Sequence, residues 1–298
     1  MSSEVPQIFD RAALRRNRRR AAAGLGDYDF LLRRAADDLA DRILVQNRQF
    51  DRVLCLGSSS GYLRRALGER GALGTKIGTL WDADLTAAML PESGGLVVDE
   101  ECLPLKPAGL DLIVSFWGLH HVNDLPGALV QMRAALKPNG VFLAALPGND
   151  NLSALRRAFL QAESDILGGA QPHIHPFADL RDLAGLMQRA GFALPVADSD
   201  IIDVRYAAPL TLLRDLRGMG ESNILTQRPR APLRRDVLTS ALTAFQKDNQ
   251  DGDKTVAQFE ICYLAGFSST GESGQARREG EPITLFDETV ITGEKPSR

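Results

Sequence analysis

The sequence predicts a doubly wound α/β protein with a mostly parallel sheet, N-terminal helices before it and a C-terminal α+β elaboration after it. Short apolar runs, which are typical of buried strands, alternate with longer runs that have helical spacing. The first apolar run leads directly into a turn that contains glycine, and the next two runs end in acidic residues. An alternation of this kind builds a parallel sheet with helices on both faces.

The expected elements of the core follow one another along residues 28–148. An amphipathic helix comes first, over 28–46, because apolar residues recur there at helical spacing. These residues are Leu31, Leu32, Ala35, Leu39 and Ile43. Strands are predicted at 51–57, 76–84, 94–101, 110–117 and 140–148, and helices at 61–70, 85–90 and 125–136.

The second half is less regular. Helices are predicted at 151–168 with Asn151 as N-cap, at 180–192 with Gly191 closing it, and at 210–220 and 231–248. A loop is predicted at 172–177, and strands at 201–206 and 259–267. The predicted domains are a basic helical segment (1–47), an α/β core (48–148), a substrate-covering elaboration that completes the sheet (149–267) and a disordered tail (268–298).

The composition is that of an ordinary globular protein, with 298 residues, 44% apolar residues and 24% charged residues. It excludes a collagen, a disulfide scaffold, a coiled coil and a disordered chain. The net charge of −3 argues against nucleic-acid binding. Cys55, Cys102 and Cys262 lie too far apart to suggest a zinc site, and their sparse number fits a reducing compartment.

Arginines crowd the N-terminal segment, where a helix is predicted from Arg11 to Ala23. They are Arg11, Arg15, Arg16, Arg18, Arg19 and Arg20. They form either a solvated helix face or a surface that docks an acidic partner or an anionic membrane. Acidic residues interrupt the segment and no apolar region follows, so no export signal is predicted. The expected location is cytoplasmic, or the mitochondrial matrix in a eukaryotic source.

The run VLCLGSSSG (53–61) predicts a strand, a turn and a helix, an arrangement that binds nucleotide-like cofactors at the carboxyl edge of a sheet. Gly57 and Gly61 allow close approach of the backbone. Asp84 ends the next strand, where a carboxylate can accept hydrogen bonds from a ribose diol. Asp99 and Glu100 end the third strand, within reach of an adenine amine. The alternative is that each acid is merely solvated.

Residues 51–147 resemble a class I S-adenosylmethionine (SAM)-dependent methyltransferase, which has a Rossmann-like fold. The resemblance is carried by LCLGSSSG (54–61), WDADLT (81–86), VDEECLPL (98–105), LDLIVSFWGLHHVND (110–124) and LKPNGVFLAALPG (136–148). Over residues 8–267 the chain resembles the respiratory complex I assembly factor 5 family, relatives of the malonyl-carrier O-methyltransferases. IFDR (8–11), PHIHPF (172–177) and GMGESN (218–223) carry this narrower resemblance. It implies hydroxylation of an arginine on an iron–sulfur subunit of complex I.

The chain departs from the family pattern in its first motif, which usually reads Asp-Leu-Gly-x-Gly-x-Gly. Cys55 replaces the acid and Ser59 replaces the middle glycine. Loss of one charge-assisted hydrogen bond weakens binding by about 1.5–3 kcal/mol. The resemblance makes SAM the expected cofactor, held by Cys55, Gly57, Ser59, Gly61, Asp84, Asp99, Glu100 and Ser115. The departure predicts weak SAM affinity, a different ligand or an empty site.

His120 and Glu221 are the candidate catalytic residues. An imidazole titrates near neutrality and can act as a base, whereas a carboxylate can accept a bidentate arginine. The alternatives are a structural role for His120 and a helix C-cap at Gly218 or Gly220. The resembled families have His at position 120 and an aromatic residue, usually Trp, at 121.

His173 and His175 suggest a metal pair, but two histidines alone are not a site and Asp179 is the one nearby acid with ligand spacing, so we predict no metal. PHIHPF is instead expected to close over the substrate.

Three functions follow from these patterns. The first is a complex I assembly factor that acts on a protein arginine. The second is a SAM-dependent methyltransferase of a carboxyl group or another small nucleophile. The third is a non-catalytic assembly chaperone with a degenerate SAM site.

Overall fold

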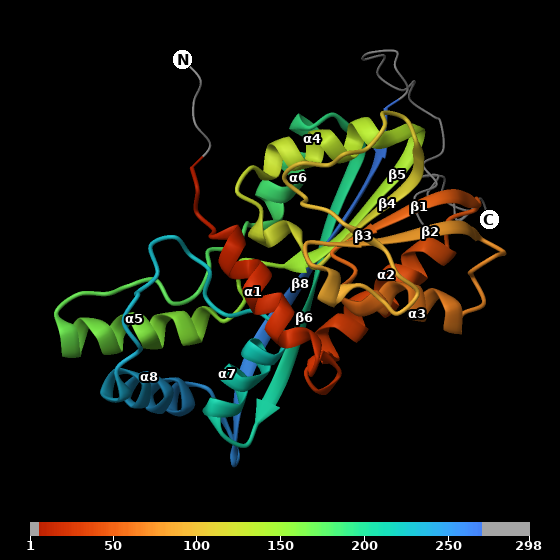
Figure 1. Ribbon diagram of the computed structural model, residues 1–298. Helices are drawn as coiled ribbons and strands as arrows, with labels where there is room; N and C mark the ends of the chain where they lie inside the picture. Colours follow the sequence, from red (N-terminus) through yellow and green to blue (C-terminus); the bar gives the residue numbers. More distant parts are fainter. Residues whose placement is uncertain (1–5, 270–298) are drawn as a thin grey trace, which may run out of the picture.

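A computed structural model describes residues 6–269, and its centre is one mixed sheet (Figure 1). The strands are β1 (Phe50–Leu56), β2 (Ile77–Asp84), β3 (Leu96–Val97), β4 (Leu110–Phe116), β5 (Leu136–Pro147), β6 (Phe192–Tyr206), β7 (Gln250–Asp251) and β8 (Lys254–Ser268). Their order is β3-β2-β1-β4-β5-β8-β6, with β7 paired to β8. The first five are mutually parallel, and β8 is antiparallel to both β5 and β6. The predicted α/β fold class is confirmed.

Helices cover both faces of this sheet (Figure 1). They are α1 (Arg11–Ala22), α2 (Phe30–Leu44), α3 (Tyr62–Glu69), α4 (Leu125–Ala135), α5 (Ser153–Leu167), α6 (Leu180–Arg189), α7 (Pro209–Gly218) and α8 (Arg235–Asp248). Apolar residues of α2, α3, α5 and α8 share the larger core, and those of α4 and α6 share the core on the opposite face. Among the described residues, no helix is both long and apolar enough to cross a membrane.

Four local predictions are wrong. Asn151 does not cap α5, because its side chain donates to the carbonyl oxygens of Gly148 and Glu260, and Leu152 stands at the N-cap. The strand predicted at 94–101 is only the two residues of β3, and the helix predicted at 85–90 is one 3₁₀ turn, Ala87–Met89. The strand predicted at 201–206 is the last part of β6, whose outer face is exposed and therefore lacks an apolar run.

The first part of β6 was not predicted because it contains Pro195, and proline is rare inside strands. It lies in a bulge, where the register with β8 shifts between Ala193 and Val196. The predicted disordered tail begins at the end of β8, and residues 270–298 lie outside the described part of the chain. The predicted domain boundaries stay predictions.

The N-terminal segment and α1 lie across the carboxyl edge of the parallel strands. Phe9 forms a β-bridge with Leu225, and Asp10 begins α1 as its N-cap, accepting a hydrogen bond from the backbone N–H of Ala13 at 2.9 Å. Arg228 also donates to the Asp10 carboxylate, at 2.7 Å. A single side chain thus begins the helix and connects it to a distant loop.

Replacing Asp10 by alanine is expected to lower the free energy of unfolding by about 1–2 kcal/mol, because the N-cap is lost. Urea unfolding measures this change. Asp253→Ala is the matched control, since the Asp253 side chain is 89% exposed. Equal stability of the two variants would contradict the capping role of Asp10.

Candidate functional site

Asp84, the residue predicted to bind a ribose, is 1% exposed at the end of β2 and is already fully paired. Arg18 of α1 donates to its Oδ2 at 2.7 Å, and the backbone N–H of Ser59 donates to the same oxygen at 3.2 Å. The backbone N–H of Thr86 donates to Oδ1 at 3.3 Å. Burial raises the pKa of Asp84, and the guanidinium of Arg18 opposes this rise.

The two acids after β3 are paired in the same way. Arg11 donates to Asp99 at 2.6 Å and to Glu100 at 2.5 Å, and Arg15 donates to Asp99 at 2.9 Å. The side chains of Arg11 and Arg18 are only 9% and 7% exposed. These two arginines therefore belong neither to a solvated helix face nor to a surface for a membrane or an acidic partner, which corrects both expectations for them.

The glycine-containing turn after β1 has left-handed backbone at Gly57, Ser59, Ser60 and Gly61. A Cβ on Gly57 would lie 2.2 Å from the carbonyl oxygen of Phe116, so β4 itself requires this glycine. Ser59, at φ +45°, carries the backbone strain expected of a non-glycine residue there. Its hydroxyl accepts a hydrogen bond from Arg18 at 3.0 Å. The serine that departs from the family pattern thus helps to hold α1.

Cys55 and Ser115 lie inside the sheet. Cys55 packs in the larger core, where burial raises the pKa of its thiol well above the ordinary value and keeps it neutral. Ser115 is fully buried on β4, and its hydroxyl has no hydrogen-bond partner among the described residues.

The residues predicted for SAM do not fit that cofactor as they are arranged here. Both carboxylate oxygens of Asp84 already accept hydrogen bonds, and an arginine covers Asp99 and Glu100. A ribose diol or an adenine amine would have to replace these buried charged contacts.

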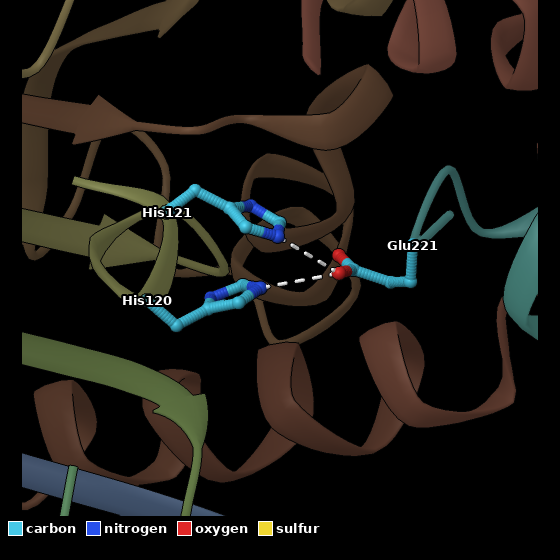
Figure 2. Close-up of side chains that lie close together, drawn as sticks. All are labelled: His120, His121 and Glu221. Atoms are coloured by element: carbon cyan, nitrogen blue, oxygen red, sulfur yellow. Dashed lines mark hydrogen bonds and ion pairs between the residues drawn. The ribbon is translucent and has the colours of Figure 1, made fainter. Parts of the chain in front are cut away.

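A second group of polar side chains lies where the chain leaves β4 and α7 (Figure 2). After β4, Trp117 takes a left-handed conformation and a 3₁₀ turn, Leu119–His121, presents two adjacent imidazoles. Figure 2 shows both of them directed at Glu221. The chain thus brings together both predicted catalytic residues, His120 and Glu221, with His121 as a third member.

Glu221 owes its position to the turn that ends α7. Gly220 has φ +89°, its N–H donates to the Arg217 carbonyl, and the N–H of Glu221 donates to the Leu216 carbonyl. This is a Schellman motif, which requires a left-handed residue at Gly220. The alternative of a C-cap is therefore correct for Gly220, and the same turn also places the carboxylate.

The imidazole Nε2 atoms of His120 and His121 lie 3.3 and 3.1 Å from the same oxygen, Oε2 of Glu221. Both imidazole side chains are 1% exposed. Burial, and then the neighbouring His120, lowers the pKa of His121 to about 3, which keeps this ring neutral. Burial favours the neutral form of Glu221, but the two imidazoles outweigh it and hold the pKa of this carboxyl well below its usual value.

His173 and His175 point to different partners. The Nε2 atom of His173 lies 2.7 Å from Glu163, whereas the Nε2 atom of His175 accepts the backbone N–H of Ile224 at 3.0 Å. The ring of His175 packs edge-on against His121, with the centroids 5.3 Å apart. The pair therefore does not form a common metal site.

A cavity of about 480 Å³, partly open to solvent, adjoins this group. Its walls are mostly apolar and come from α5, α7, β8 and the PHIHPF loop, including Leu155, Phe159 and Leu216. Its polar residues include Glu221, His175 and Asn223, and also Arg217. The cavity suits a long side chain with an apolar stem and a cationic end.

Sequence reasoning missed Arg11 and Arg18 as parts of the site, and it considered His121 beside His120 but chose only His120 as a catalytic residue. The doublet of histidines after a buried strand, in place of the single histidine of the resembled families, was the available signal for His121. The arginines gave no such signal, because their partners are distant in sequence.

Comparisons with known proteins agree with this fold. A family model described as a methyltransferase domain matches residues 28–195. The human arginine-hydroxylase NDUFAF5, mitochondrial, is 35% identical over 297 residues, covering 96% of this chain and 84% of the human protein. A malonyl-acyl-carrier-protein O-methyltransferase from Gallionella capsiferriformans is 28% identical over 272 residues, covering 86% and 90%. The crystal structure of the YcgJ protein from Bacillus subtilis, at 14% identity and a TM-score of 0.53, covers 79% of this chain and 99% of YcgJ and supports the fold alone.

Proposed function

Because the chain belongs to the methyltransferase-domain family and is homologous to arginine hydroxylases over nearly its whole length, we propose that it hydroxylates an arginine side chain of a protein. The proposed substrate is an iron–sulfur subunit of complex I, which the sequence resemblance implies. The observation that carries this proposal is the apolar cavity with Glu221 in its wall.

Glu221 matches the charge of a guanidinium. Both imidazoles contact its Oε2 atom. A carboxylate oxygen with a lowered pKa remains anionic at neutral pH and accepts N–H donors from arginine. The apolar walls of the cavity suit the methylene stem of the same side chain.

Mass spectrometry of the partner subunit, isolated from cells with and without this protein, tests the proposal. We expect a gain of one oxygen atom on one arginine, present only when the protein is present. Dioxygen would supply this atom, with two electrons from an added reductant and the second oxygen atom released as water. A gain of one methylene group would instead support methyl transfer, and an unmodified subunit would support a purely assembling role.

SAM-dependent methylation is the second candidate, and the family match favours it. We expect SAM to bind weakly, because Arg18 and Arg11 already occupy the carboxylates. Calorimetric titration of the purified protein with SAM measures this affinity. Binding in the low micromolar range would contradict the expectation and favour the methyltransferase.

A non-catalytic assembly chaperone is the third candidate. The arginines of α1 that fill the predicted cofactor site favour it. Two measurements distinguish it from the other candidates. The mass of the partner subunit would be unchanged, and complex I assembly would fail in cells that lack this protein.

A further inference from the structure

We infer that His120, His121 and Glu221 form a binding site for one divalent first-row transition-metal ion, with Fe(II) as the candidate that suits the donors. These are the three residues drawn in Figure 2, and their ligand atoms all lie within 4.8 Å of one another. The metal site itself is argued from the geometry. Only the choice of iron rests on the proposed function.

Two of the three distances between the donor atoms are those of ligands on a common ion. Two ligands that each lie about 2.0–2.1 Å from a metal, at angles between octahedral and tetrahedral, are about 2.8–3.4 Å apart. The two imidazole Nε2 atoms lie 3.3 and 3.1 Å from Glu221 Oε2.

The hydrogen bonding of His121 gives a second, independent observation. The residue is 1% exposed, and neither of its ring nitrogens has a hydrogen-bond partner with acceptable geometry in the described part of the chain. Its Nε2 is close to the carboxylate but is not aligned to donate to it. A buried imidazole with a free lone pair beside a carboxylate is arranged for a metal better than for a hydrogen bond.

The donor set narrows the kind of metal. Two imidazoles and one carboxylate, with further positions open, are typical of non-haem Fe(II) sites and of catalytic zinc sites, whereas structural zinc sites are closed by four protein ligands. The proposed hydroxylation selects iron between the two. Glu221 also lines the 480 Å³ cavity, so the open side of the site adjoins the space proposed for the arginine.

Titration of the metal-free full-length protein with Co(II) under anaerobic conditions tests the site, with visible absorption and elemental analysis as readouts. We expect one Co(II) per chain. His121→Phe and Glu221→Gln are expected to weaken binding by about 100-fold or more, since even the outer partners of a metal site contribute 10- to 100-fold. His173→Gln, which changes a histidine paired with Glu163, is the matched control and keeps the wild-type affinity.

His121→Phe keeps an aromatic ring in the buried position, and its thermal unfolding shows that the variant is folded. No Co(II) uptake by the wild-type protein, or equal uptake by all the variants, would overturn the inference. Arginine hydroxylation by protein that is freed of metal and kept in chelator would also overturn it while leaving the proposed function intact. Stoichiometric Co(II) binding with no arginine product would support the metal site and reject the proposed function.

Discussion

Replacing Arg18 by methionine is expected to lower the free energy of unfolding by about 3–5 kcal/mol, because Asp84 is left as a buried charge without its partner. Asp84 is 1% exposed and Arg18 is 5% exposed, so water cannot take the place of the guanidinium. The methionine retains most of the apolar stem, which limits the loss of packing. Urea unfolding measures the change, and the melting temperature should fall by roughly 10 °C.

A double-mutant cycle separates the charge effect from packing. Combining Arg18→Met with Asp84→Asn should recover a large part of the lost stability, since no buried charge then remains unpaired. Arg16→Met, on the exposed side of the same helix, should leave stability nearly unchanged. An Arg18 variant as stable as the Arg16 variant would show that α1 does not pair with Asp84 in solution.

Replacing Glu221 by glutamine is expected to reduce arginine hydroxylation by a factor of about 30 to several thousand. Removing one partner of a buried charged hydrogen-bonded pair costs about 2–5 kcal/mol, and glutamine has no charge to offer a guanidinium or a metal. The isosteric shape preserves the Schellman turn, because that turn uses only the backbone of Glu221. Quantitative mass spectrometry of the partner subunit measures the product.

The two roles of Glu221 predict different kinetics. Loss of guanidinium binding raises KM, whereas loss of a metal ligand lowers kcat. Glu163→Gln is the matched control, because Glu163 is another glutamate paired with a histidine, His173. Full activity of the Glu221→Gln variant would show that the carboxylate is needed neither to bind the guanidinium nor to bind the metal.

The sequence predicted the parallel core well, because its signals are local. The apolar run of β4 and the turn around Gly57 each arise within a few residues. Glu221 was also found from a local pattern, since two glycines precede it in the segment GMGESN (218–223). Strand β6 was predicted too short, since it has an exposed face and a bulge at Pro195 in place of an apolar run.

Pairing across the fold could not be predicted. Arg18 and Asp84 are 66 positions apart, and His120 and Glu221 are 101 apart. A run of arginines on a helix has the same pattern whether it faces water or buried acids, so its composition alone cannot distinguish the two. The metal site was likewise sought at the local pair His173 and His175 rather than at residues that only the fold brings together.

The attachment of the N-terminus to a late part of the chain has a consequence for biosynthesis. Arg228, which holds Asp10, lies 218 positions after it. At a translation rate of about 5–20 residues per second, the ribosome needs roughly 10–45 s to add that length. During that interval α1 lacks its docking loop, so this helix can be fixed across the carboxyl ends of the parallel strands only after Arg228 has been made.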